Sequence, residues 1–272
     1  MRTVLVTGVT SGIGAETALA LDRAGWSVVG GARDLDDAAA LVKGTSDRFR
    51  PVRLDVTDAA SIAAAVATIG ELDAVVNNAG VGIAGPLEVL PLDHLREQLE
   101  VNVIGQIAVT QAVLPLIRRS GGRIVFVGSI GGKIALEFAG PYHASKYAME
   151  AVADVLRQEL AEDGIPVVLI EPGAMATPIW AKAATRLDAL FEAAPPGLDR
   201  YASRLRSFQD SLRSAGKAGA SPAKVAETIL TALDSDSPAH RYAVGASAKA
   251  VSALRPILPD KLVDFIGSRL SR

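Results

Sequence analysis

Short apolar runs alternate with longer stretches in which apolar residues recur at helical spacing along this chain. Uninterrupted apolar runs are typical of strands buried on both faces of a parallel sheet, and the longer stretches are typical of amphipathic helices. The runs lie at 3–6, 27–29, 52–54, 74–76, 123–127, 167–170 and 241–244. This alternation predicts an α/β fold, a doubly wound parallel sheet of about seven strands with helices on both faces and right-handed crossovers.

Capping signals place the helices between these runs. We expect the first helix to open at Ser11 or Gly12 and to run to about residue 24, where Gly25 closes it. The next helices are predicted to open at Asp34, at Thr57 or Asp58, after Pro91, at Tyr142 and at Ser221-Pro222. The helix after Pro91 should end near residue 119, and the helix from Tyr142 should reach residue 163.

The regular alternation fails after Pro172-Gly173. Residues 174–220 contain two helix-like segments, at 178–193 and 198–214, which we interpret as an insertion in a single domain that covers 1–272. A tail follows at about 246–272, and its stretch 250–272 is amphipathic, with Phe265, Ile266 and Leu270 among its apolar residues. We predict a helix packed on the domain, and a membrane-surface or subunit contact is the alternative.

Composition narrows the classes of function. Of the 272 residues, 49% are hydrophobic but only 4% are aromatic, which favours a core of small aliphatic side chains. The net charge of −2 offers no basic surface for nucleic acid. The chain has no cysteine, and His94, His143 and His240 lack the spacing of a zinc site, so we expect no metal and assign these histidines surface or capping roles.

The chain shows no targeting signal. The apolar start after Met1 is too short for a signal peptide, and no later stretch approaches the roughly 18 uninterrupted apolar residues of a spanning helix. We therefore expect a cytoplasmic protein with no segment that spans a membrane.

A glycine-rich turn follows the first predicted strand, with the sequence Thr7-Gly-Val-Thr-Ser-Gly-Ile-Gly14. Gly8 permits a tight turn, Gly12 lets backbone N–H groups approach a pyrophosphate, and Gly14 lets the helix pack close to the sheet. The N-terminus of the helix adds free donors and the positive end of its dipole. At this place in an α/β chain, the turn predicts a nucleotide site.

Tyr142 and Lys146 lie one helical turn apart, so they share a helix face. A cation at this distance, together with the helix N-terminus, should lower the pKa of the tyrosine toward neutral pH and suit it to proton transfer. The spacing alone is weak evidence, because a solvated pair looks the same. The pair begins the helix after the strand that leads to Ser129, and this position supports a catalytic role.

These motifs together resemble the single-domain branch of the short-chain dehydrogenase/reductase family, over nearly the whole chain. The glycine turn, Asn77-Asn78-Ala79-Gly80, Asn102, Ser129, Tyr142 with Lys146, and Pro172-Gly173 followed by Thr177 occur in the order of that family. The resemblance implies a Rossmann-type sheet with the strand order 3-2-1-4-5-6-7. It also implies a homodimer or homotetramer.

The resemblance implies four catalytic residues. Tyr142 would be the acid in carbonyl reduction and the base in alcohol oxidation, and Ser129 would hydrogen-bond the substrate oxygen. Lys146 would hold the nicotinamide ribose and lower the pKa of Tyr142, and Asn102 would hold a water molecule of a proton relay.

The end of the second strand bears on the choice of cofactor. NAD-preferring relatives usually carry an acid where Ala32 stands, whereas the next residue here is Arg33, which suits a 2′-phosphate. Asp34 lies at the generic spacing of a ribose-binding acid and keeps NAD(H) possible, so NADP(H) is favoured. The cofactor-binding residues predicted in this way are Gly8, Thr10, Ser11, Gly12, Ile13, Gly14, Arg33, Asp55, Val56, Asn78, Ala79, Gly80, Tyr142, Lys146, Pro172, Gly173 and Thr177.

The stretch 101–160 and the tail most resemble the hydroxysteroid and retinol dehydrogenase-like relatives. We therefore predict an NADP(H)-dependent oxidoreductase that interconverts an alcohol and a ketone or aldehyde on a lipophilic small molecule. Glu137-Phe138 should border the substrate pocket, and the insertion should cover it with Trp180, Phe191 and Phe208, for which core packing is the alternative.

Two other functions stay open. A 3-oxoacyl reductase would need a basic patch for its acyl carrier, and the insertion offers Arg186, Arg204 and Arg206 without a clear cluster. A cofactor-binding sensor or scaffold without catalysis is the alternative from a different class.

Overall fold

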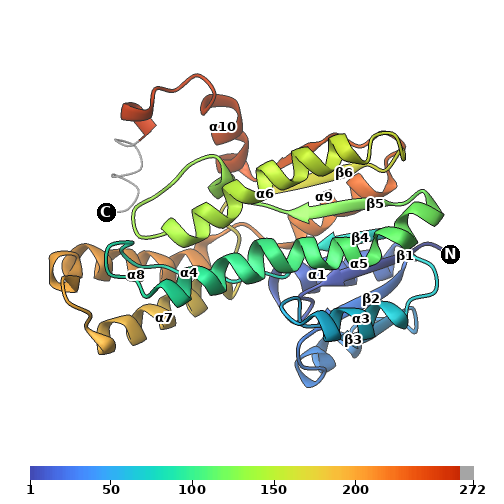
Figure 1. The fold of residues 1–272 in the computed structure, drawn as a ribbon, viewed down its shortest axis with the longest axis horizontal. Helices are drawn as coiled ribbons and strands as arrows, with labels where there is room; N and C mark the ends of the chain where they lie inside the picture. The colour runs from blue at the N-terminus through green and yellow to red at the C-terminus, as the bar shows by residue number, and fades with distance from the viewer. Residues whose placement is uncertain (264–272) are drawn as a thin grey trace.

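A parallel sheet of seven strands, in the order β3-β2-β1-β4-β5-β6-β7, forms the centre of the computed structural model, which describes residues 1–263 (Figure 1). The α/β class and the strand order predicted from the sequence are confirmed. The strands are β1 (Thr3–Thr7), β2 (Ser27–Ala32), β3 (Phe49–Arg53), β4 (Ala74–Asn77), β5 (Arg123–Val127), β6 (Val167–Pro172) and β7 (Arg241–Val244).

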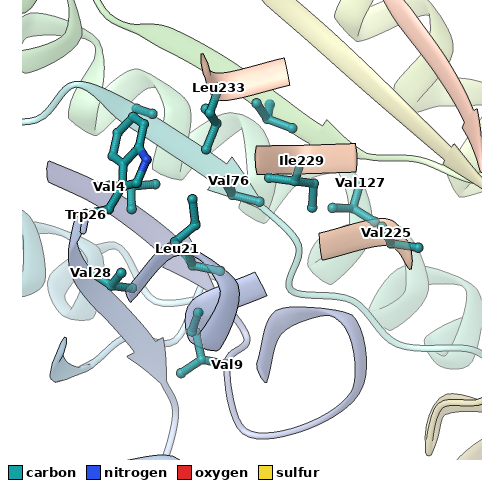
Figure 2. Packing of buried hydrophobic residues seen from close by; sticks show 14 of the residues in the cluster. Val4, Val9, Leu21, Trp26, Val28, Val76, Val127, Val225, Ile229 and Leu233 are labelled. Atoms are coloured by element: carbon teal, nitrogen blue, oxygen red, sulfur yellow. The ribbon is translucent and has the colours of Figure 1, made fainter. Parts of the chain in front are cut away.

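Helices cover both faces of the sheet, as its apolar strands require. Successive residues of β1 alternate between the two faces, so that Val4 and Val6 pack in one core cluster and Leu5 in the other. On the first face the strand residues meet α1 (Gly12–Arg23) and α9 (Ala223–Asp234), and Figure 2 shows Leu21 and Ile229 converging there. The opposite face is covered by α3 (Ala59–Ala67), α5 (Gly105–Ser120) and α6 (Gly140–Glu159).

Several boundaries differ from the sequence prediction. Strand β2 continues through Gly30 and Gly31, beyond the predicted apolar run 27–29, because both residues still pair with β1 and β3. The segment after Asp34 is a short 3₁₀ turn (Asp36–Ala38) followed by α2 (Ala39–Val42) rather than a full helix. By contrast, Asp58 caps α3 as predicted, since its carboxylate accepts from the backbone N–H of Ala60 at 2.9 Å.

The long helix after Pro91 has three parts, α4 (Leu92–Leu99), a π-helical turn (Glu100–Ile104) and α5. Its span Leu92–Ser120 contains an 18-residue window with a mean hydropathy of 1.4, and by length and composition alone the helix could cross a membrane. The sequence prediction concerned uninterrupted apolar residues, and polar residues such as Asn102, Gln106 and Gln111 do interrupt this helix. In the fold, however, Val109, Val113 and Ile117 of this helix are buried against the sheet, as in a core helix.

The insertion forms α7 (Ile179–Ala193), a 3₁₀ turn (Leu198–Arg200) and α8 (Ala202–Ala218), which project together from one end of the molecule (Figure 1). We call these elements the lid. A third apolar cluster lies between them and the loops beside α4, and Leu187, Leu205 and Phe208 of the lid contribute to it.

The tail differs from the prediction of one helix from 250. Helix α10 (Ala246–Leu254) starts earlier and ends before Pro256, because proline lacks the N–H that a helix interior needs. Helical residues begin again at Asp260, directly after Pro259, where proline is tolerated because the first turn needs no N–H from it. The predicted apolar residues Phe265, Ile266 and Leu270 lie outside the described residues.

Candidate active site

A cleft of about 500 Å³ opens at the carboxyl ends of the central strands. This is the edge at which open α/β sheets bind their ligands. It brings together the four predicted catalytic residues and the predicted cofactor residues from every segment of the chain, and among these only Gly14 does not line it. Their roles stay predictions, but their convergence is a property of the structure.

The glycine turn adopts backbone angles that favour glycine. Gly8 and Gly12 have φ angles of 72° and 58°, in the left-handed region that favours glycine. A Cβ on Gly14 would lie 2.1 Å from the carbonyl oxygen of Gly8, which explains why Gly14 packs under the turn and not in the cleft. A Cβ on Gly12 would come within 3.1 Å of Thr177 and fill the space between the turn and the lid.

The Asn-Ala-Gly segment after β4 braces this turn. Asn78 donates from Nδ2 to the carbonyl oxygens of Thr7 and Gly8, at 2.9 and 3.1 Å. The Thr7 hydroxyl accepts in return from the backbone N–H groups of Asn78 and Ala79. The first N–H groups of α1 remain directed to the cleft, because no side chain caps that helix. A glycine cradle below an uncapped helix N-terminus fits the pyrophosphate of a dinucleotide.

Asn102 lies in the π-helical turn between α4 and α5 and is fully buried. Its side-chain oxygen accepts from the Val81 N–H at 2.8 Å, and its amide donates to the Val81 carbonyl at 3.0 Å. The amide also donates to the Ser145 hydroxyl at 3.1 Å, and this hydroxyl donates to the Tyr142 carbonyl at 2.7 Å. Asn102 therefore links the loop after β4 to the helix that carries Tyr142. The sequence predicted Asn102 but neither the π turn nor Ser145.

Ser129, Tyr142 and Lys146 meet at one end of the cleft. Ser129 caps the 3₁₀ turn η3 (Ile130–Gly132), and its hydroxyl accepts from the Gly131 N–H at 3.0 Å. Lys146 is buried, with its Nζ 5.8 Å from the centre of the Tyr142 ring and donating to the Val127 carbonyl at 2.9 Å. The helix face predicted from the spacing is present, and it points into the cleft.

Burial governs the charge states of these groups. Burial raises the pKa of Tyr142, and the hydrogen bond with Ser129 only partly opposes this shift. The prediction that neighbouring positive charge lowers this pKa is wrong for this structure, because burial disfavours the charged phenolate. Burial likewise lowers the pKa of Lys146 to about 8. Tyr142 therefore holds its proton at neutral pH, which is the form that can donate to a carbonyl oxygen.

At the other end of the cleft, Arg33 lies exposed after β2 and lines the opening. Asp34 does not line it, and its carboxylate instead accepts from the Asp36 N–H at 3.0 Å. Asp55 is fixed by Thr57, whose N–H and hydroxyl donate to its carboxylate at 2.9 and 2.7 Å. Burial opposes ionisation of Asp55, but these hydrogen bonds and the nearby cation of Arg33 outweigh it and lower its pKa.

The lid adds residues to the cleft that the motifs did not indicate. Arg186 of α7 forms a bidentate ion pair with Glu97 of α4, at 2.6 and 2.7 Å, and both side chains line the cleft. Trp180, which was predicted from the sequence to lie at the pocket, also lines the cleft and donates from Nε1 to the Met175 carbonyl at 2.6 Å.

The other aromatic residues predicted to lie at the pocket pack elsewhere. Phe138 and Phe208 are buried in the lid cluster with their rings 5.8 Å apart, and Phe191 lies under Arg206. Glu137 pairs with Arg204 at the surface of the lid. The prediction that Glu137 and Phe138 border the pocket is therefore not met at this cleft, because lid packing takes up both side chains.

His143 is buried, so of its two expected roles the surface role is wrong, and its Nδ1 lies 2.9 Å from the Gly131 carbonyl oxygen. Burial lowers its pKa. Within residues 1–263, no three or more histidine and acidic side chains gather in a way that could hold a metal ion.

Comparisons with known proteins agree with this geometry. The family model described as short chain dehydrogenase matches residues 2–188. The 17-beta-hydroxysteroid dehydrogenase type 6 of Bos taurus is 36% identical over 278 residues, which cover 98% of this chain and 87% of that protein. The NADPH-dependent 3-dehydrocapnine reductase of Ornithobacterium rhinotracheale is 33% identical, covering 98% and 96%. A solved short-chain dehydrogenase from Streptomyces avermitilis matches with a TM-score of 0.79 and 30% identity, covering 96% of this chain and 93% of that one.

Proposed function

Because the chain belongs to the short-chain dehydrogenase/reductase family, whose members are oxidoreductases that act on CH–OH groups, we propose that it interconverts an alcohol and its ketone or aldehyde with NADP(H). The observation that carries the proposal is the meeting of Ser129, Tyr142 and Lys146 at one end of the cleft that the glycine turn lines. A proton donor and a dinucleotide cradle in one cleft are the two parts that the reaction needs.

Each catalytic side chain has a role that its geometry supports. A bound nicotinamide supplies or accepts the hydride. Tyr142, protonated at neutral pH, donates its proton to the carbonyl oxygen during reduction. The Ser129 hydroxyl hydrogen-bonds the same oxygen and stabilises the charge that develops on it. Lys146 places a cation near the Tyr142 ring and would hold the nicotinamide ribose, and Asn102 fixes the helix that carries both residues.

The preference for NADP(H) is proposed from Arg33. Its guanidinium lies at the mouth of the cleft, where a 2′-phosphate would extend, whereas the competing acid Asp34 faces its own helix turn. The NADPH-dependent relative at 33% identity supports the same choice.

A lipophilic substrate is proposed from the lid and from the hydroxysteroid dehydrogenase relative. The three arginines that were considered for an acyl-carrier partner do not form a free basic patch. The side chains of Arg186 and Arg204 are paired with Glu97 and Glu137, and Arg206 lies over the Phe191 ring. This favours a small apolar carbonyl compound over a 3-oxoacyl group on a carrier protein.

Fluorescence titration of NADPH and NADH tests the cofactor. We expect the wild type to prefer NADPH and Arg33→Ala to lose this preference, because the cation opposite the 2′-phosphate is removed. Arg53→Ala is the matched control, since Arg53 lies nearby on β3 but does not line the cleft. Equal or tighter binding of NADH by the wild type would contradict the assignment.

Turnover tests the reaction. We expect the wild type to oxidise NADPH with at least one of androstanedione, retinal and decanal, and Tyr142→Phe to abolish this turnover while it still binds NADPH. Full turnover in Tyr142→Phe would overturn the role of Tyr142. Tight NADPH binding without turnover of any of the three compounds would favour the sensor or scaffold instead.

A further inference from the structure

Behind the catalytic residues lies a group of charged side chains that the proposed chemistry does not use. We call it the charged cluster, and it comprises Lys133, Glu150, Asp154, Glu171 and Arg241. Three of its members directly adjoin segments of the site. Lys133 ends the turn that Ser129 begins, Glu150 lies one helical turn after Lys146, and Glu171 immediately precedes Pro172.

Glu171 lies at the centre of the cluster and is only 1% exposed. Its Oε2 accepts from Lys133 Nζ at 2.6 Å and from the Ser252 hydroxyl of α10 at 3.2 Å. Its Oε1 lies 3.3 Å from Arg241 Nε, close enough for an ion pair but without hydrogen-bond geometry. A single carboxylate therefore joins the turn after Ser129, strand β7 and the tail helix to the end of β6.

Arg241 extends this connection to the helix that carries Tyr142 and Lys146. Its Nε donates to Glu150 at 3.1 Å, and its terminal nitrogen donates to Asp154 at 2.8 Å, both on α6. The turn and this helix also touch directly, since a Cβ on Gly132 would lie 2.8 Å from the Lys146 carbonyl oxygen. A shift of Lys133 or Glu171 would therefore move the turn against α6, and the relative position of Ser129 and Tyr142 would change with it.

The composition of the cluster does not suit a role in stability alone. Its two most buried members, Glu171 and Glu150, are both acids, and burial together with the charge of Glu171 raises the pKa of Glu150. Buried ions lose hydration that their pairing seldom restores in full, so apolar residues of similar volume would hold the fold as well. Directional ion pairs do, however, fix the relative positions of the segments that they join.

We propose that Glu171 is a positioning residue for the reaction, acting through Lys133 on the turn that bears Ser129 and through Arg241 on the helix that bears Tyr142 and Lys146. The inference rests on the proposed function, because it assigns these three residues to the chemistry. Glu171 itself does not line the cleft.

The test compares Glu171→Gln, Lys133→Met and the double variant, with steady-state turnover of NADPH and the most active of androstanedione, retinal and decanal. We expect kcat to fall about tenfold or more in each single variant, because a misplacement of about 1 Å at a reacting group can cost roughly a hundredfold in rate. The Kd of NADPH should stay unchanged. The kcat of the double variant should be no lower than that of the less active single variant, since Glu171→Gln already breaks the connection through Lys133. Lys133→Arg should restore most of kcat.

A structural role alone would give a different pattern. In one such pattern the variants would have a lower thermal midpoint but an unchanged kcat well below that temperature. In the other, the free-energy costs in kcat of the two single variants would add in the double variant. Either result overturns the proposal. Lys133→Met keeps the test available if Glu171→Gln does not fold, because the lysine is partly exposed. Asp163→Asn is the control, since it breaks the Arg118–Asp163 pair beyond the far end of α6 and should leave kcat unchanged.

Tyr142→Phe separates this inference from the proposed function. If it abolishes turnover while the Glu171 and Lys133 variants keep the kcat of the wild type, only the inference fails. If it retains turnover, or if none of the three carbonyl compounds is reduced by the wild type, the proposed function fails and the inference falls with it.

Discussion

At the scale of single residues, burial decides how the two titrating groups of the site behave. Tyr142 and Lys146 come from one helix face and line the cleft, where desolvation disfavours the charged form of each. The result is a tyrosine with a raised pKa beside a lysine whose pKa falls to about 8. The sequence correctly indicated that the two residues share a face. It could not indicate the direction of the Tyr142 shift, because burial depends on which segments cover the helix.

The lowered pKa of Lys146 makes the stability of the protein dependent on pH. Between about pH 8 and the ordinary lysine value of 10.5, the unfolded chain binds a proton that the folded chain has lost. The free energy of unfolding of the ligand-free wild type should therefore rise with pH in this window relative to Lys146→Met, by about 3 kcal/mol at most. Urea unfolding at several pH values measures this difference. Lys249→Met, which removes an exposed lysine, should show no such rise, and a flat difference for Lys146→Met would contradict the prediction.

At the scale of elements, the π-helical turn Glu100–Ile104 interrupts the helix where Asn102 is needed. Turns of this kind often mark functional sites, because the extra residue redirects a side chain. Here it aims Asn102 at both the N–H and the carbonyl group of Val81 and at Ser145. One side chain thus joins three elements around the cleft.

Replacing Asn102 tests how much its hydrogen bonds contribute to stability and to turnover. Asn102→Ala should lower the free energy of unfolding by about 1–3 kcal/mol, because it leaves polar partners without a hydrogen bond in the interior. It should also lower turnover, since the helix that carries Tyr142 loses a contact. Chemical denaturation measures the first effect and steady-state kinetics the second. Gln111→Ala, at an exposed position of the same long helix, should change stability by less than about 0.5 kcal/mol. Equal losses in the two variants would contradict the assignment.

The elements also show which parts of the fold a sequence can reveal. Strands such as Arg123–Val127 were predictable because burial on both faces leaves an uninterrupted apolar run, and Asp58 was predictable because a cap depends on neighbouring residues. The π turn has no such local signal, since its extra residue is stabilised by the distant Val81. The end of α10 was missed because its apolar spacing continues through Pro256, although a local rule would have found the break.

At the scale of the whole molecule, the lid meets the rest of the protein through an apolar cluster bordered by ion pairs. The cluster holds Leu187 and Phe208 against Leu90 and Phe138. Among the ion pairs, Glu97–Arg186 differs from the others because both partners line the cleft. This pair therefore joins α4 to α7 at the wall of the cleft.

Breaking this pair should loosen the lid without disturbing the sheet. In Glu97→Gln the Arg186 guanidinium loses its bidentate carboxylate, so we expect faster tryptic cleavage within α7 and α8 and an unchanged free energy of global unfolding. The hydrogen bond from Arg186 lowers the pKa of Glu97, so the wild-type pair contributes in full above the ordinary carboxyl value of 4.5 and is lost as pH falls through the lowered value of the folded protein. Trypsin does not work in acid, so amide hydrogen exchange of α7 and α8 measures the pH dependence. It should show the difference between wild type and variant at neutral pH and not at a pH below the lowered pKa of Glu97. Asp93→Asn removes an exposed pair one turn earlier on α4 and should behave like the wild type in both measurements. If Glu97→Gln did the same, the apolar cluster alone would hold the lid, and access to the cleft would depend on packing rather than on charge.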